Sequence, residues 1–458
     1  MSEKVREDVY FNLLPTKSEE RVWGFWDFLA VQICFGIAAW FFLVGGFTGL
    51  VLPAKLAIPV IIFGNQVPLF LMSLLALFGA RYGIETFLSA RPMFGPRGAD
   101  AWIIIYITSS YGWIAYASFL FGEAAYKFSK LLGLPEVIST EIPGAIIWAV
   151  IATLIGVYIA YRGPTILKWF MRIAAIFLMA VLLGFIYYIF AIYGIGKIFS
   201  LPPPEPYMKD DQIDWPHNIA SALEWNVGLG FSWAFWYGQY TRLARSESGA
   251  YHGTLWGWGI LACIAGVFSA LTALIVGSFD PTDWIVALGT VEFALIGLLL
   301  MAIANISSVA TLVYPLSITL RSRLPRVKWK WAVLITSLPA IILENPQTFA
   351  SYNIYLTYIA LLTGIFAGIL TGDYLLTRGG YYLRDIYNYK GGRYWYFKGV
   401  NPAGAIAAIV ATGFYLWTWD PLLGVSHNGL FDKISAGIPT FFVTMFLYII
   451  LSKALKLR

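Results

Sequence analysis

The sequence predicts an all-α polytopic membrane protein with twelve transmembrane helices. Hydrophobic residues make up 59% of the 458-residue chain and charged residues only 12%, and the mean hydropathy is +0.70. Soluble domains carry about 25% charged residues. A surface with so few charges must therefore face lipid rather than water. This composition excludes a cytosolic enzyme, a nucleic-acid binder and a disordered protein.

Twelve apolar runs provide the spans, each close to the roughly 20 residues that a membrane helix needs. In chain order they cover residues 26–50, 56–80, 101–125, 143–161, 168–195, 217–240, 253–277, 286–320, 331–345, 350–371, 402–419 and 436–453. The eighth run is long enough to tilt, and the ninth is short and ends at Glu344-Asn345-Pro346. The sequence lacks the alternating ten-residue segments of a β-barrel, so we expect helical spans.

The basic residues support this count and give an orientation. If both termini lie on one side, that side collects all of the 31 lysines and arginines except Lys55, Lys127, Lys130, Lys197, Lys209 and Lys433. Lys and Arg concentrate in cytoplasmic loops. We therefore expect both termini in the cytoplasm and the protein in the plasma membrane. The net charge of +6 then reflects membrane topology rather than nucleic-acid binding.

Glycines interrupt two spans at matching places. Helix 1 carries Gly36 in mid-span, and helix 6 carries Gly228 and Gly230. Paired interruptions are typical of inverted-repeat transporters with a midplane site, although single glycines in membrane helices also allow close packing. We expect a cytoplasmic N-terminal segment, a first repeat, an extracellular loop, a second repeat, a cytoplasmic loop and two C-terminal helices, at 1–25, 26–197, 198–216, 217–371, 372–401 and 402–458.

Aromatic residues inside the spans are candidates for a substrate site. Trp113 lies at the centre of helix 3 among small residues, and Phe231 and Trp233 follow the glycines of helix 6. Rings from two helices could stack on both faces of a flat heterocycle, and core packing is the alternative.

Polar residues inside the spans are the second set of candidates. Glu224 lies one turn before Gly228, and we expect it to face a water-filled vestibule, with a role in binding substrate or a proton. Asn305 to Thr311 place several side-chain oxygens on helix 8. These could replace the hydration shell of a small cation, whereas hydroxyls also bond to their own helix.

Three segments carry a family resemblance. They are RYGIETFLSARPMFGPRG at 81–98, GDYLLTRGGYYLRDIYNYKGGRYWYFKGVNPAG at 372–404, and Gln239-Tyr240-Thr241-Arg242 at the end of helix 6. With Trp113, they resemble the nucleobase:cation symport-1 family, which transports nucleobases, hydantoins, allantoin and related compounds. The resemblance implies a LeuT-like five-plus-five inverted repeat with two added C-terminal helices, alternating access, and symport with Na⁺ or H⁺.

The resemblance also implies substrate-site residues by position. It makes Trp113 the stacking wall, and it places Ala117, Ile37 and Thr311 where family members contact the substrate. The helix 6 aromatic position falls on Gly230, so Phe231 or Trp233 would take that role.

A sodium site is implied in the same way. It would use Ile33 and Gly36 of helix 1 with Ala302, Asn305 and Ile306 of helix 8. Family members with this site carry two adjacent hydroxyl residues where this chain has Asn305 and Ile306. The substitution weakens the expectation of Na⁺ coupling.

We therefore expect a secondary active transporter that couples a small planar heterocycle to a cation, with Na⁺ as the candidate coupling ion and no other cofactor. The alternative is a proton-coupled or uncoupled transporter of a different small polar or vitamin-like substrate. An enzyme is disfavoured because His217, His252 and His427 are scattered in loops or at helix ends. The expected partners are the substrate and the lipid bilayer. The oligomeric state stays open, and a monomer is compatible with the pattern.

Overall fold

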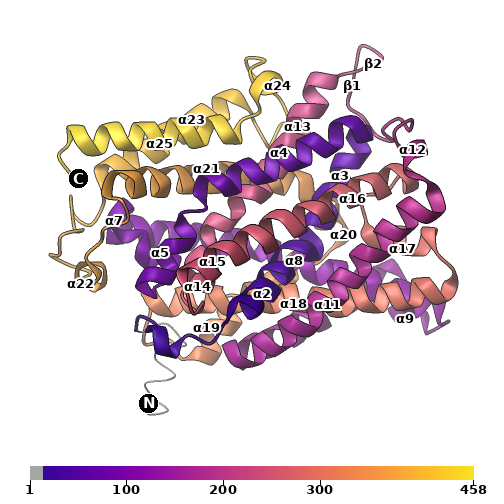
Figure 1. Ribbon diagram of the computed structural model, residues 1–458, viewed down its shortest axis with the longest axis horizontal. Helices are drawn as coiled ribbons and strands as arrows, with labels where there is room; N and C mark the ends of the chain where they lie inside the picture. The colour runs from indigo at the N-terminus through magenta and orange to yellow at the C-terminus, as the bar shows by residue number, and fades with distance from the viewer. Residues whose placement is uncertain (1–13, 458) are drawn as a thin grey trace.

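The computed structural model describes residues 14–457 as a bundle of helices (Figure 1). Eight helices of this part of the chain are long and apolar enough to cross a membrane. They are α4 (Ala54–Met72), α8 (Pro96–Leu131), η3 with α10 (Glu141–Tyr161), α11 with η4 (Pro164–Tyr193), α15 to α16 (Glu247–Val276), α18 (Val291–Arg323), α21 (Tyr352–Thr377) and α25 (Gly437–Ala454).

The other four expected spans consist of shorter pieces. They are α2, η2 and α3 (Phe25–Gly36, Ile37–Phe41, Phe42–Val51); α13, η5 and α14 (Trp215–Ser232, Trp233–Phe235, Tyr237–Thr241); α19 and η7 (Trp329–Ile335, Leu338–Leu343); and α23 (Pro402–Thr418). The twelve expected spans are therefore present. The C-terminus lies at the left end of the bundle, whereas α9 (Glu136–Ser139) and the β1–β2 hairpin lie at the right (Figure 1).

Short elements connect the spans. They are η1 (Ser18–Glu20), α5 (Leu75–Tyr82), α6 (Thr86–Ser89), α7 (Arg91–Phe94), α12 (Ile195–Ile198), β1 (Met208–Lys209), β2 (Gln212–Ile213), α17 (Pro281–Leu288), α20 (Pro346–Ala350), α22 (Leu383–Tyr387) and α24 (Phe431–Ile434). The hairpin turns at Asp210 and Asp211, whose φ angles are 50° and 60°. Asp tolerates this left-handed conformation better than most residues do. The hairpin lies in the expected extracellular loop.

The helix contacts agree with an inverted repeat. The second helix of the first half, α4, packs along the first helix of the second half, α13. In the equivalent contact, the second helix of the second half, α16, packs along α3 in the first helix of the first half. Similarly, α11 of helix 5 packs on α2, and α21 of helix 10 packs on α13. The third helix of each half, α8 and α18, pack against each other. Exchanging the two halves therefore reproduces the same set of contacts.

The first helix breaks where we expected, and the sixth breaks later. α2 ends at Gly36 and continues as the π-helical turn η2, a type of irregularity that is frequent at functional sites. By contrast, α13 continues through Gly228 and Gly230 to Ser232 and then tightens into the 3₁₀ turn η5. The glycines of helix 6 serve close packing, because a Cβ on Gly228 would lie 2.2 Å from the Leu356 carbonyl oxygen.

Glycines also join α3 to its neighbours. A Cβ on Gly45 would lie 2.3 Å from the carbonyl oxygen of Gly266 on α16, and one on Gly49 would lie 2.3 Å from that of Ala270. A Cβ on Gly46 would lie 2.4 Å from the carbonyl oxygen of Phe279 in the loop after α16. The backbones of α3 and α16 therefore touch directly.

The three segments that resemble the family meet in the structure. The Arg97 N–H donates to the Gly399 carbonyl at 2.8 Å, and the Asn401 N–H donates to the Phe94 carbonyl at 2.8 Å. The Gly238 N–H, next to the third segment, donates to the Thr86 hydroxyl at 2.9 Å. These residues form one layer at the end of the bundle where the C-terminus lies (Figure 1).

Candidate substrate site

A small aromatic cavity lies where the broken helices 1 and 6 meet helices 3 and 8. It is lined by Phe35, Trp40, Trp113, Ser232, Trp236, Trp258 and Leu312. The Trp113 ring meets the Trp40 ring edge-on at a centroid distance of 4.9 Å, and it meets the Tyr355 ring in the same way at 5.0 Å. The cavity volume is about 10 Å³, barely room for one water molecule. The site is therefore closed, and its rings leave no space for a larger molecule in this conformation.

The structure brings Trp113 into this cavity but supplies a different partner from helix 6. Trp236, directly after η5, lines the cavity. Phe231 instead stacks on Phe441 of α25, with centroids 5.0 Å apart. Trp233 is fully buried outside the lining, with its ring 5.9 Å from that of Tyr237. Of the helix 6 aromatics, Trp236 rather than Phe231 or Trp233 therefore lines this cavity, and the helix 6 residue that contacts a substrate stays a prediction.

The remaining positions implied by the resemblance are buried but do not line the cavity. Gly230 faces α4, where its Cβ would lie 3.0 Å from the carbonyl oxygen of Gly64. Ala117 and Ile37 are fully buried, one turn after Trp113 and at the start of η2 respectively. The Thr311 hydroxyl donates within its own helix, to the carbonyls of Ser307 and Ser308 at 3.0 and 2.8 Å. Helix 8 contributes Leu312 instead.

Glu224 does not face a vestibule. Its side chain is fully buried, and the carboxylate accepts hydrogen bonds from the Tyr415 hydroxyl at 2.7 Å, the Ala436 N–H at 2.9 Å, the Gly437 N–H at 2.8 Å and the Ser435 hydroxyl. The Tyr415 hydroxyl also lies 2.8 Å from the Thr357 carbonyl oxygen, so its single hydrogen is shared between the two acceptors. Glu224 therefore fastens α13 to α23 and to the start of α25.

Sequence reasoning missed Trp40, Trp236 and Trp258. Each lies in or beside an irregular turn: Trp40 in η2, Trp236 after η5 and Trp258 in the π-helical turn η6 (Leu255–Leu261). An indole inside a span combined with a helix irregularity is the signal that identifies them. Trp40 follows Gly36 by one turn, so this signal was readable for helix 1.

The residues of the expected cation site lie on α2 and α18, which are in contact. Asn305 donates its amide N–H to the Met301 carbonyl at 2.9 Å, while its Oδ1 is buried without a partner among the described residues. The Ile33 carbonyl accepts from the Ile37 N–H. Ala302 and Ile306 can offer only main-chain carbonyls. Asn305 Oδ1 is thus the only side-chain oxygen among these five positions.

Aromatic and ionic contacts join the helices at the end of the bundle opposite the C-terminus (Figure 1). The Phe47 ring of α3 stacks on the Phe279 ring at 4.3 Å. Nearby, the Lys127 ammonium on α8 lies 2.8 Å from an Asp280 carboxylate oxygen, 2.7 Å from one of Asp283 and 3.1 Å from one of Glu123. One cation thus holds three carboxylates and joins α8 to α17.

The segment before α2 packs against the end of helix 6. The Trp23 ring stacks on the Tyr240 ring with centroids 6.2 Å apart, and the main-chain N–H of Trp23 donates to the Leu243 carbonyl at 3.0 Å. Glu85 is fully buried in the same region and accepts from the N–H groups of Phe87 and Leu88 at 2.9 and 2.6 Å. Burial raises the pKa of Glu85 above its ordinary value of 4.5, and the two N–H groups oppose that rise.

A closed aromatic cavity at two helix breaks within an inverted repeat defines a membrane permease rather than an enzyme. A family model described as "Permease for cytosine/purines, uracil, thiamine, allantoin" matches residues 15–430. The chain belongs to this permease family.

Relatives agree with this assignment. The chain is 25% identical over 408 residues to a hydantoin permease from Microbacterium maritypicum, covering 84% of this chain and 80% of the relative. Its fold resembles that of Mhp1, a nucleobase-cation-symport-1 family transporter in a closed conformation with bromovinylhydantoin bound, with a TM-score of 0.79, 21% identity and coverage of 97% and 96%. A Na⁺-coupled sialic acid symporter matches with a TM-score of 0.61 at 13% identity, over 98% and 93%.

Proposed function

We propose that this permease carries a flat heterocycle of the nucleobase or hydantoin class by alternating access, with the ring held between Trp113 and Trp236. The observation that carries the proposal is the cavity itself, because indole rings from helices 1, 3, 6 and 7 converge on it. Stacking on an aromatic ring contributes about 1–3 kcal/mol per base. We infer that the end of the bundle carrying the C-terminus faces the cytoplasm, since most of the basic residues gather there.

Ligand-induced thermal stabilisation of the purified full chain tests this proposal. A ligand that binds only the folded state raises the apparent Tm by mass action, so a panel of nucleobases, hydantoins and allantoin should contain at least one stabilising compound. Trp236→Ala should weaken its binding about 5- to 150-fold, which corresponds to about 1–3 kcal/mol. Trp26→Ala is the matched control, because Trp26 is 75% exposed on α2. Equal binding by the two variants would reject Trp236 as a wall.

Na⁺ is the first candidate for the coupling ion. The supporting feature is the unpartnered Oδ1 of Asn305 beside the break of helix 1. Oxygen ligands suit a hard cation. Uptake into proteoliposomes at fixed pH should then follow an imposed Na⁺ gradient, and Asn305→Leu should abolish that dependence.

A proton is the second candidate, and Glu344 supports it instead of Glu224. Glu344 Oε1 accepts from the Thr153 hydroxyl at 2.5 Å, and Thr153 bonds to the Ser118 hydroxyl of α8 at 2.6 Å. Glu344 is 2% exposed, its Oε2 lacks a partner, and none of the described cations forms an ion pair with it. Burying a charged carboxylate without a partner is costly, so this group is suited to hold a proton.

The two candidates separate cleanly by experiment. If a proton is coupled through Glu344, a pH gradient drives uptake without Na⁺, and Glu344→Gln removes that drive while substrate exchange continues. If the Na⁺ gradient alone drives uptake and Glu344→Gln behaves as the wild type, the proton proposal fails.

A further inference from the structure

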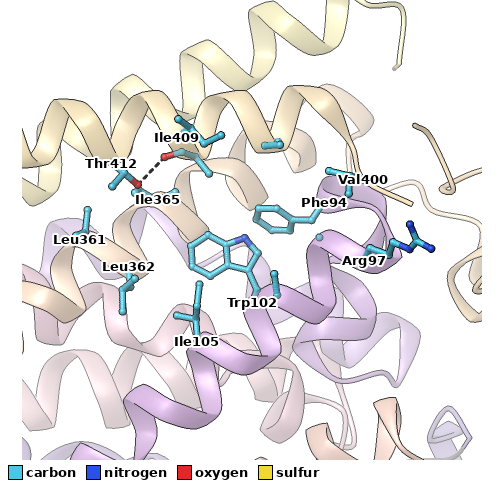
Figure 2. A pocket seen from close by; sticks show the side chains of 15 residues that line it. Phe94, Arg97, Trp102, Ile105, Leu361, Leu362, Ile365, Val400, Ile409 and Thr412 are labelled. Atoms are coloured by element: carbon cyan, nitrogen blue, oxygen red, sulfur yellow. Dashed lines mark hydrogen bonds between the residues drawn. The ribbon is translucent and has the colours of Figure 1, made fainter. Parts of the chain in front are cut away.

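We propose that the groove between α8, α21 and α23 binds one anionic glycerophospholipid. The groove has a volume of about 420 Å³ and lies away from the aromatic cavity, on a different set of side chains. Figure 2 shows its shape: Trp102 and Phe94 form the floor, Ile409 and Thr412 of α23 lie on one side, and Arg97 stands at one end.

The helices that form the groove place its occupant in the membrane. Along α8 and α23 the neighbouring outward-facing side chains are apolar and exposed, with Ile104 at 65% and Ile409 at 71%. Exposed isoleucines on spanning helices face acyl chains rather than water. Apart from Arg97 and Thr412, the lining side chains are apolar, and the Thr412 hydroxyl already donates to the Ala408 carbonyl at 2.9 Å (Figure 2). A hydrocarbon chain therefore matches the body of the groove.

The charge at one end selects an anionic headgroup. Arg97 is exposed, its guanidinium lies 5.4 Å from the centre of the Trp395 ring, and none of the described acidic residues forms an ion pair with it. Asp100, one turn further along α8, is already held by Arg323 at 2.7 Å. Lys398, also exposed, adds a second cation beside Gly399, whose carbonyl accepts from the Arg97 N–H. Arginine is well suited to bind a phosphate through two parallel hydrogen bonds.

Trp102 fits the layer between headgroup and chain. It follows Arg97 by five residues, which is about 7.5 Å along a helix. That rise is at the upper limit of the roughly 5–7.5 Å thickness of one interfacial layer of a bilayer. Among the described residues none accepts a hydrogen bond from the Trp102 indole N–H, and the ring lines the groove. In this arrangement the Trp102 indole N–H donates a hydrogen bond to an ester carbonyl of the lipid. The lipid phosphate then lies at Arg97, and one acyl chain runs past Ile105 and Ile365.

Native mass spectrometry of the purified full chain tests the site, with added phosphatidylglycerol, phosphatidylcholine or palmitate as probes. We expect one retained phosphatidylglycerol per chain, bound more tightly than phosphatidylcholine. Arg97→Gln should weaken its retention about fivefold, since one basic residue near an anionic lipid contributes about 1 kcal/mol. The matched control is Arg162→Gln, which removes an exposed arginine at the end of α10, away from the groove.

A second pair of variants tests the groove itself. Ala408→Trp places an indole inside it and should displace the lipid, whereas Val410→Trp changes a 47% exposed position of α23 outside the lining and should leave binding unchanged. Equal retention of phosphatidylcholine or palmitate would overturn the headgroup assignment. Wild-type retention by both Arg97→Gln and Ala408→Trp would overturn the site.

Discussion

Glu224 offers a direct test of whether a buried carboxylate in this permease is structural or functional. Replacing it by Leu leaves the N–H groups of Ala436 and Gly437 without acceptors, because both donate to the same Glu224 oxygen. A buried unsatisfied donor costs about 1–3 kcal/mol, so Glu224→Leu should lower the free energy of unfolding by about 2–6 kcal/mol from these two groups. The Tyr415 hydroxyl shares its single hydrogen between Glu224 and the Thr357 carbonyl in the parent, and in this variant it donates to the Thr357 carbonyl alone.

Two milder variants give a graded series. In Glu224→Gln the amide oxygen can still accept from the N–H groups while its NH₂ faces the Tyr415 oxygen, so only charge assistance is lost. Charge-assisted hydrogen bonds are roughly twice as strong as neutral ones, and with three donors on Oε2 the loss is about 3 kcal/mol. Tyr415→Phe removes one donor and should cost least, about 1–2 kcal/mol.

The measurements are thermal unfolding of the purified variants in detergent and substrate exchange in proteoliposomes. The structural role predicts that apparent Tm falls in the order Tyr415→Phe, Glu224→Gln, Glu224→Leu, and that the folded fraction of each variant still binds substrate. If Glu224→Gln keeps the wild-type Tm but loses pH-driven uptake, the carboxylate acts in transport and our reasoning is refuted.

Two further predictions concern the closed ends of the bundle. Lys127→Met leaves the carboxylates of Asp280 and Glu123 buried without their cation. Breaking a buried ion pair costs about 3–5 kcal/mol. We expect the closed conformation to lose up to about 3 kcal/mol, the lower end of that range, because the third carboxylate, Asp283, is 44% exposed. The test uses a variant whose single cysteine replaces Phe279. A thiol reagent should modify this cysteine faster when Lys127→Met is also present than when Lys127 is kept. An unchanged rate would contradict a role of Lys127 in keeping this side closed. For Glu85, the raised pKa means that the folded state holds its proton to higher pH than the unfolded state, so its contribution to stability falls as pH rises above about 4.5. Glu85→Gln should flatten the fall of apparent Tm with pH, and an unaltered slope would show that another group is responsible.

The sequence was sufficient for features that depend on local composition. Apolar run length located the expected spans, eight of which are helices long and apolar enough to cross a membrane among the described residues, and the indole of Trp113 in mid-span marked a side chain that lines the aromatic cavity. It was insufficient where a role depends on distant partners. Glu224 bonds to residues more than 200 positions away, and Phe231 stacks on Phe441 of the final helix. The sequence also cannot show whether a glycine in helix 6 interrupts the helix or allows a neighbouring helix to pack closely. The close contact between Gly228 and Leu356 of helix 10 shows that this glycine serves packing.

The backbone contacts between α3 and α16 have a mechanical consequence. Gly45, Gly46 and Gly49 of α3 touch carbonyl oxygens of α16 and of the loop after it, so no side chain there can rotate to let one helix slide past the other. Packed interiors shift between discrete arrangements rather than deforming continuously. The outer part of helix 1, helix 7 and the Phe279 loop should therefore travel as one rigid unit. We expect the neighbouring turn η2 to be the hinge of that unit, because it separates α3 from α2.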